Sequence, residues 1–155
     1  MTTKLSLGAQ SDLIRAIVED FVPRFVPECK LVHVGDPDTN WGYFDRGPLA
    51  RLGVQIESLG KMPDVVLHSV VKGWLLLVES STSGGVIDGN RRAELARAFA
   101  SSALGLVYVT VFPDRDTMAR QLSAIAWETV AWVVDSPTHL VHFNGERLLG
   151  PYAST

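Results

Sequence analysis

The stretch PDVVLHSVVKGWLLLVE, residues 63–79, decides the fold. Its first part, Asp64 to His68, is expected to form a strand, and Lys72 with Gly73 marks a turn. The run from Trp74 to Glu79 is nearly all apolar, which predicts a strand buried on both faces in the middle of a sheet. Two neighbouring strands joined by a short turn form an antiparallel hairpin.

A helix and a further strand are expected before this hairpin. Ser11 is placed to cap a helix over residues 12–21, in which apolar side chains recur at helical spacing. Pro23 and Pro27 are expected to end that helix, because proline interrupts helical hydrogen bonding. The apolar run over residues 31–34 predicts a short strand.

The rest of the chain alternates between strand and helix patterns. The expected elements are a helical turn at 48–52, a short strand at 53–57, helices at 91–103 and 116–125, and strands at 105–112, 129–134 and 140–143. This order predicts an α/β fold in which a mixed β-sheet is flanked by helices.

Composition predicts one soluble domain over residues 1–155. Hydrophobic residues make up 46% of the chain, enough for a sizeable core, so disorder is excluded. The net charge of -3 differs from the basic footprint usual for nucleic-acid binders. Cys29 is the single cysteine and forms no internal disulfide, which fits a reducing compartment. No apolar run approaches the ~20 residues of a membrane span. We therefore expect a cytoplasmic protein without membrane contact.

Two carboxylates stand at the ends of the hairpin strands. Asp64 begins the first strand and Glu79 ends the second, and these two ends lie side by side in an antiparallel hairpin. A pair of hard oxygen ligands at the mouth of a sheet suits Mg²⁺. The alternative is that both carboxylates are simply solvated strand ends.

The surrounding strings are similar to those of one enzyme family. They are VGD (34–36), GKMPDVVLH (60–68), WLLLVES (74–80), GLVYVTVFPDR (105–115), IAWETVAW (125–132) and PTHLVHFNGERLLGPY (137–152). Over residues 13–152 the chain resembles, collinearly, the catalytic domain of BsuBI/PstI-type type II restriction endonucleases, members of the PD-(D/E)xK nuclease superfamily. The resemblance implies a restriction-endonuclease-like fold and Mg²⁺-dependent cleavage of double-stranded DNA in a restriction–modification or phage-defence system, with Mn²⁺ as a substitute cofactor.

The same resemblance implies a ligand set for the metal. Asp64 and Glu79 would bind it through their carboxylates, and the backbone carbonyl of Ser80 would add a ligand. Glu19 lies on the first helix, from which an acid joins the metal site in many proteins of this wider fold. A solvated carboxylate on the helix surface is the alternative for Glu19.

The lysine that usually accompanies such a site is absent from its usual position in this sequence. The general signature has lysine two residues after the glutamate, where this chain has Ser81. Lys61 is therefore the candidate for the missing ammonium, with an ordinary surface lysine as the alternative. Arg91 matches an arginine of the family and is expected to contact a phosphate or to position Glu79. The residues expected to serve catalysis are thus Asp64, Glu79, Lys61 and Arg91.

DNA contacts are expected from four further residues. Ser83 and Gly84 belong to a Gly/Ser-rich loop that could lie against DNA through its hydroxyl and backbone N–H groups. Asn40, Gly84 and Asn90 stand where lysine, histidine and lysine are common in the family. These replacements would lower affinity for a phosphate.

The resemblance also implies partners. Members of the family carry an additional N-terminal recognition region of similar size, which this chain is expected to lack, so a separate DNA-recognition domain or chain is one expected partner. Cleavage of both strands by one active site per chain favours a homodimer. The alternative function is a catalytically impaired nuclease-fold domain that acts as a DNA-binding or assembly module.

Overall fold

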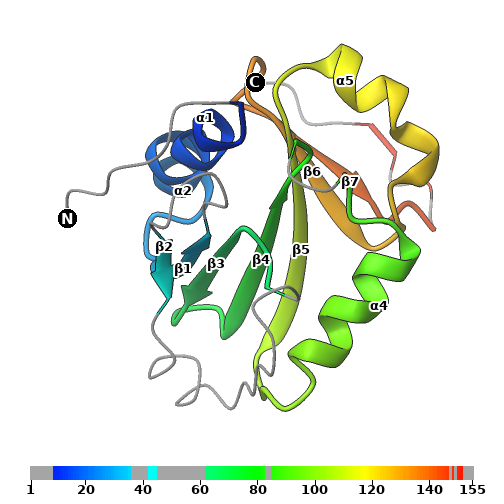
Figure 1. Cartoon of the computed structure of the whole chain (residues 1–155). Coiled ribbons are helices and arrows are strands. Elements are labelled where there is room, and N and C mark those ends of the chain that lie inside the picture. The colour runs from blue at the N-terminus through cyan, green and yellow to red at the C-terminus, as the bar shows by residue number, and fades with distance from the viewer. Residues whose placement is uncertain are drawn as a thin grey trace.

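A mixed seven-stranded sheet with strand order β2-β1-β3-β4-β5-β6-β7 organises the computed structural model (Figure 1). The structure describes residues 9–35, 42–44, 62–82, 85–146, 148 and 150–151. The strands are β1 (Lys30–Gly35), β2 (Gly42–Phe44), β3 (Val65–Ser69), β4 (Trp74–Ser80), β5 (Gly105–Phe112), β6 (Thr129–Val133) and β7 (Leu140–Phe143). The helices are α1 (Ala9–Ala16), η1 (Ile17–Phe21), α2 (Val22–Phe25), α4 (Gly89–Ala98), α5 (Arg115–Arg120) and η3 (Leu122–Ala124).

The hairpin predicted from the sequence is formed by β3 and β4. These strands are antiparallel, with Val65 opposite Val78 and Ser69 opposite Trp74. On its other side β4 pairs in parallel with β5, which pairs in parallel with β6. After its first residue every residue of β4 is buried, as expected for an apolar strand in the middle of a sheet. The predicted α/β fold with a mixed sheet flanked by helices is therefore confirmed.

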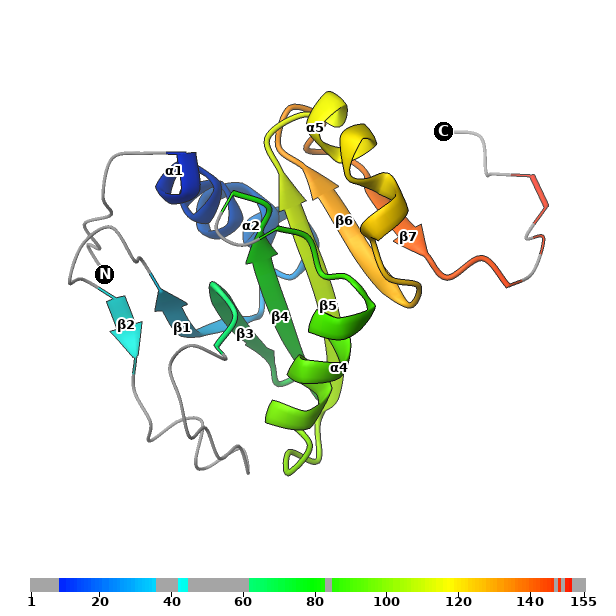
Figure 2. The same ribbon diagram turned by 45° about the vertical axis from the view of Figure 1, so that its right-hand side comes forward.

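Helices cover both faces of the sheet, as Figure 2 shows: α1 and α2 lie on one side, and α4 and α5 on the other. Alternate residues of β4 enter the two cores. Leu76 and Val78 pack in the same core as Ile14 and Phe21 of the first helical segment. Leu75 and Leu77 belong to a second core, which includes Leu95 of α4 and Phe99 directly after that helix. By the same alternation Glu79 points to the α4 side and Ser80 to the α1 side.

The first helical segment departs from the prediction at both ends. It begins at Ala9, so Ser11 lies inside α1 instead of capping it. The expected stop at Pro23 is wrong, because α2 continues to Phe25. A π turn, η1, ends at Phe21, two residues before Pro23, and is closed by the wider hydrogen bond from the Val22 N–H to the Ile17 carbonyl. Such a turn relieves the clash that a proline ring makes in a regular α-helix.

Other boundaries differ less. The expected strands at 105–112 and 140–143 are found with the same bounds, and α4 is shorter than predicted. Strand β2 was not expected, since its three residues show no periodic pattern. The helical turn expected at 48–52 and the strand expected at 53–57 fall outside the described residues. Within the described part of the chain, no helix is long and apolar enough to cross a lipid bilayer.

Candidate active site

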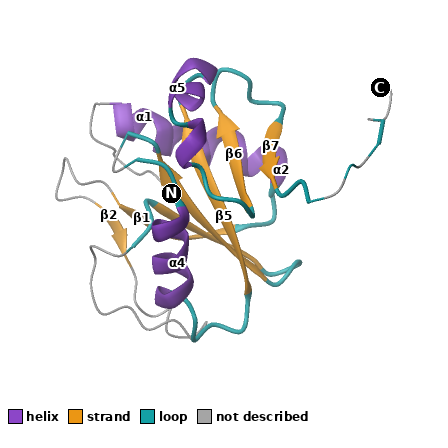
Figure 3. Ribbon diagram, turned by 90° about the vertical axis from the view of Figure 1, so that its right-hand side faces the viewer, coloured by secondary structure: helices purple, strands orange, loops and turns teal. Residues whose placement is uncertain are grey.

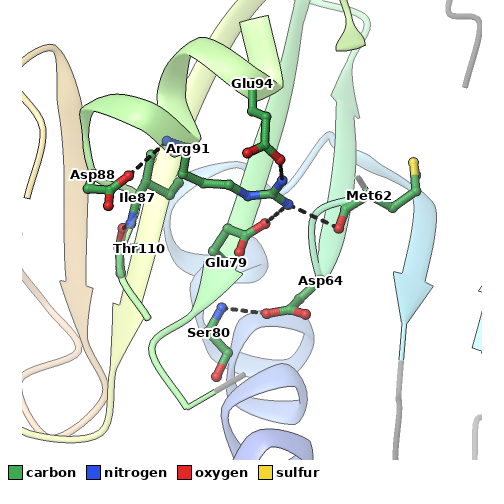
Figure 4. A network of polar contacts seen from close by, with 9 residues as sticks. All are labelled: Met62, Asp64, Glu79, Ser80, Ile87, Asp88, Arg91, Glu94 and Thr110. Atoms are coloured by element: carbon green, nitrogen blue, oxygen red, sulfur yellow. Dashed lines mark hydrogen bonds and ion pairs between the residues drawn. The ribbon is translucent and has the colours of Figure 1, made fainter. Parts of the chain in front are cut away.

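The two carboxylates of the hairpin lie at the same end of the sheet (Figure 4). Asp64 directly precedes β3, and Glu79 is the sixth residue of β4. Because Val65 pairs with Val78, the chain positions one step further out are Asp64 and Glu79. The antiparallel register therefore carries both residues to one edge, as expected from the sequence.

Asp64 is held by the backbone of β4. The Ser80 N–H donates a hydrogen bond of 2.7 Å to Asp64 Oδ2. Ser80 is itself fully buried, and its hydroxyl lies 2.7 Å from that of Thr82. The hydrogen bond from the Ser80 N–H to Asp64 links the start of β3 to the end of β4 and orients the aspartate where the two strands lie side by side.

Glu79 is held from the other side by Arg91 of α4. Arg91 Nη2 donates to Glu79 Oε1 at 2.6 Å and to the Met62 carbonyl oxygen at 3.2 Å. Its other terminal nitrogen, Nη1, donates to Glu94 Oε1 at 2.9 Å. A single guanidinium therefore connects β4, α4 and the segment that leads into β3.

The start of α4 is fixed by caps that place Arg91 at the site. Asp88 caps the helix by accepting a hydrogen bond from the Arg91 N–H at 2.8 Å. The preceding residue, Ile87, donates its N–H to the hydroxyl of buried Thr110 at 3.2 Å. Thr110 is the register partner of Glu79 in the neighbouring strand. The helix that carries Arg91 is therefore attached to the strand beside Glu79.

The electrostatics of the site favour an added cation. Burial raises the pKa of the Glu79 carboxyl to about 7, and the negative charges of Asp64 and Glu94 act in the same direction. The hydrogen bond and the charge of Arg91 oppose this rise. Glu79 and Glu94 thus share one guanidinium, while Asp64 adds a further negative charge beside Glu79. Asp64 and Glu79, with the Ser80 carbonyl, would offer the oxygen donors that Mg²⁺ requires. The residues present fit a divalent cation.

Several predicted site residues are not brought into this cluster. Glu19 lies exposed on the π turn η1. Among the described residues, no group of three or more His, Cys, Asp or Glu side chains is close enough to hold a metal ion. Asn90 is exposed at the start of α4, next to Arg91. The remaining predicted site residues lie outside the described residues: Asn40, Lys61, Ser83 and Gly84.

The position that usually holds lysine is occupied by a buried serine. Ser81 is 9% exposed, and within the described part of the chain its hydroxyl has no hydrogen-bond partner. Its backbone N–H donates to the Val111 carbonyl at 2.9 Å, which extends the pairing of β4 with β5 by one residue. No ammonium group can come from this position, and a cation supplied from elsewhere stays a prediction.

Sequence reasoning missed Glu94 and the Met62 carbonyl as partners of Arg91. The spacing of Arg91 and Glu94 by three residues on an expected helix was the available signal, since such residues are neighbours on a helix surface. The Met62 carbonyl carries no sequence signal at all, because any residue has one.

The family model of the BsuBI/PstI restriction endonuclease domain matches residues 1–146. The chain belongs to this family. It is 55% identical over 145 residues to the type II restriction enzyme BsuBI of Bacillus subtilis, an alignment that covers 94% of this chain and 46% of that protein.

More distant relatives agree with this assignment. The type II restriction enzyme AplI of Arthrospira platensis is 29% identical over 154 residues, covering 96% of this chain and 48% of the relative. The structure of the SdaI restriction endonuclease matches with a TM-score of 0.89 and 42% identity, over 97% of this chain and 47% of that one. The chain is thus homologous to type II restriction enzymes and spans about half the length of the relatives it matches.

Proposed function

We propose that this domain is the catalytic part of a Mg²⁺-dependent endonuclease that hydrolyses phosphodiester bonds of double-stranded DNA. The observation that carries the proposal is the pairing of Asp64 and Glu79 at one end of the β3–β4 hairpin, in a chain that belongs to a restriction endonuclease family. A cytoplasmic restriction–modification or phage-defence system is the setting that this chemistry fits.

In the proposed site, Asp64, Glu79 and the Ser80 carbonyl would hold the metal, and Glu19, which lies exposed on η1 outside this cluster, is not part of the set. A bound Mg²⁺ supplies Lewis acidity that polarises a phosphoryl oxygen and lowers the pKa of an attacking water. Mn²⁺ can replace it, since the same oxygen ligands serve both ions.

The residues of the chain prepare this site in two ways. The Ser80 N–H fixes the direction of Asp64, and Arg91 keeps Glu79 oriented at the end of β4. The positive charge of Arg91 also favours the ionised form of Glu79, the form that binds a cation. Lys61 is proposed to supply the ammonium that Ser81 does not.

Double-stranded DNA is the proposed substrate and partner. Asn40, Ser83, Gly84 and Asn90 are proposed to contact it. Because the net charge is -3 and phosphate binding depends on basic residues, the domain should bind DNA weakly on its own at physiological salt. A homodimer would supply one active site for each strand, and a separate recognition domain or chain would supply sequence specificity.

A second candidate function is a nuclease-fold module that binds DNA or assists assembly without cutting. The specific observation in its favour is Ser81, a buried hydroxyl at the position where the general signature has lysine. The two functions differ in one measurable property, which is metal-dependent hydrolysis.

Plasmid cleavage tests this proposal directly. Supercoiled plasmid is incubated with the protein and Mg²⁺ or Mn²⁺, and the wild type is compared with Asp64→Ala and Glu79→Ala. The matched control is Glu146→Ala, which removes an exposed carboxylate beyond β7. We expect cutting that needs metal, is lost in both site variants and is retained in the control. A wild type that binds DNA but does not cut would contradict the nuclease and favour the binding module.

A further inference from the structure

One guanidinium in the site is divided between two carboxylates on different elements. Arg91 Nη2 contacts Glu79 on β4, and Nη1 contacts Glu94 on α4, one helical turn further along (Figure 4). The contact to Glu79 uses one oxygen, Oε1, and is not the two-pronged pairing that arginine forms with a single carboxylate in its strongest ion pairs. Arg91 is therefore shared, with a separate nitrogen for each partner.

The two carboxylates differ in burial and in their link to Arg91. The Glu79 side chain is 9% exposed, whereas that of Glu94 is 44% exposed. Glu94 and Arg91 are three residues apart on one helix, so their distance is set by α4 alone. The distance from Arg91 to Glu79 depends instead on how α4 packs against the sheet.

A cation that binds Glu79 would meet Arg91 at the same carboxylate. The guanidinium and a divalent ion both carry positive charge, and repulsion between them is strong in a largely buried site. Either the arginine leaves Glu79 or the ion binds poorly. Glu94 offers the arginine a second anion that is already in contact with it at 2.9 Å.

We propose that Glu94 is a positioning residue that retains Arg91 when a divalent cation takes Glu79, so that Nη2 of Arg91 becomes available to a phosphate oxygen of the DNA. This inference rests on the proposed function, because it needs a metal at Glu79 and DNA as substrate. No covalent step is involved. Arg91 exchanges one anion for another while Glu94 holds its position.

Metal affinity without any cleavage gives the first test. Mn²⁺ binding to the full chain is measured by electron paramagnetic resonance for the wild type, Glu94→Gln and the control Glu146→Gln. Removing the charge of Glu94 leaves Arg91 with Glu79 as its one anionic partner among the described residues, so the arginine competes harder with the metal. We expect Mn²⁺ to bind Glu94→Gln about two- to fivefold more weakly, the range implied by a part-exposed ion pair. The control should be unchanged.

A double-mutant cycle separates this role from a direct effect of the Glu94 charge. Arg91→Gln and the double variant Arg91→Gln/Glu94→Gln are added to the series, each checked for folding by its thermal unfolding curve. If Glu94 acts through Arg91, the Glu94→Gln effect disappears once Arg91 is replaced. An equal or larger effect in that background would mean that Glu94 acts on the metal directly and would overturn the proposal.

Salt dependence of DNA binding tests the second half of the exchange. Duplex binding is measured in Ca²⁺, as a probe cation, and in EDTA. Loss of one phosphate contact lowers the slope of log K against log salt by about 0.9. We expect that loss for Arg91→Gln in Ca²⁺ and a smaller one in EDTA, where Glu79 still holds the arginine. A merely structural role for Arg91 would change both slopes equally.

The outcomes also separate this inference from the proposed function. A wild type that binds no Mn²⁺ would overturn both. A wild type that binds Mn²⁺ and cuts DNA, together with a Glu94→Gln variant of unchanged Mn²⁺ affinity, would overturn the role of Glu94 alone.

Discussion

A carboxylate lies at each end of the β3–β4 hairpin: Glu79 belongs to β4, and Glu28, which precedes β1, contacts Ser69 at the other end. The pKa values of these two carboxylates are shifted in opposite directions. At one end Glu79 is buried near Asp64 and Glu94, and burial raises its pKa to about 7. At the other end Glu28 accepts a 2.6 Å hydrogen bond from the Ser69 hydroxyl, and this bond lowers the pKa of Glu28. One end of the hairpin therefore faces a carboxylate that is costly to ionise, and the other end faces one that ionises readily.

The surroundings explain the difference. Glu28 is partly exposed, and the nearby Lys72 adds an attractive charge. Ser69 is fully buried, and its hydroxyl also accepts a hydrogen bond from the backbone N–H of Lys72 at 3.1 Å. We call this pair of hydrogen bonds, which joins Glu28, Ser69 and Lys72, the latch. Glu79 faces two like charges and one shared arginine. The surroundings of Glu28 stabilise its anionic form, whereas the negative charges and burial around Glu79 disfavour its anionic form, which an added cation would stabilise.

The largest expected difference between the two ends is in catalysis. Glu79→Gln removes the charge of a proposed metal ligand and keeps the side chain's shape, so we expect metal-dependent cleavage to fall by at least about 10³-fold. Glu28→Gln makes the same chemical change at the other end and should cut within about twofold of the wild type. Single-turnover plasmid cleavage measures both. Similar losses in the two variants would mean that the assay reports folding instead of metal binding.

The next difference is in the pH dependence of stability. The Glu79 carboxyl ionises near pH 4.5 in the unfolded chain but only near pH 7 in the folded protein. Between these two values the folded state binds more protons than the unfolded state, so the free energy of unfolding falls as pH rises. For Glu79 this fall is on the order of 2–3 kcal/mol between pH 5 and pH 8. Urea unfolding in EDTA should show a larger fall for the wild type than for Glu79→Gln.

Glu28 supplies the opposite sign as a control. Its lowered pKa adds stability that is present above its ordinary value and is lost as pH falls through the folded pKa. Replacing Glu28 by glutamine should therefore flatten the acid side of the stability curve and leave the fall toward pH 8 in place. An identical fall in the wild type and in Glu79→Gln would contradict the raised pKa of Glu79.

Sequence patterns predicted the parts of the fold that rest on burial. The run from Trp74 to Glu79 is apolar because β4 is covered on both faces, and the antiparallel hairpin then places Asp64 next to Glu79 without further information. The stop at Pro23 was predicted wrongly, because the π turn that accommodates the proline is a backbone arrangement with no side-chain pattern. Strand β2 was too short to show a period.

The site was predictable only in part for a related reason. Its two carboxylates stand at strand ends, where a charge is unusual beside apolar residues, and the family resemblance pointed to Arg91. The sharing of Arg91 with Glu94 and with the Met62 carbonyl depends on how α4 packs against the sheet, a long-range property that no local pattern reports. The roles of Asn40, Lys61, Ser83 and Gly84 stay predictions.

The smallest expected effect concerns the latch itself. Ser69→Ala removes a hydroxyl that donates to Glu28 and accepts from the backbone N–H of Lys72. In the variant, water can form hydrogen bonds with both groups instead. We expect a loss of about 1–2 kcal/mol in the free energy of unfolding, seen as a lower thermal midpoint by roughly 2–6 °C. Ser123→Ala, at an exposed serine, should stay within about 0.5 kcal/mol of the wild type. Because the latch lies at the end of the hairpin away from Asp64 and Glu79, Mn²⁺ affinity should not change in Ser69→Ala. A weakened Mn²⁺ affinity there would show that the two ends of the hairpin are coupled through β3 and β4, and that the division of roles between them does not hold.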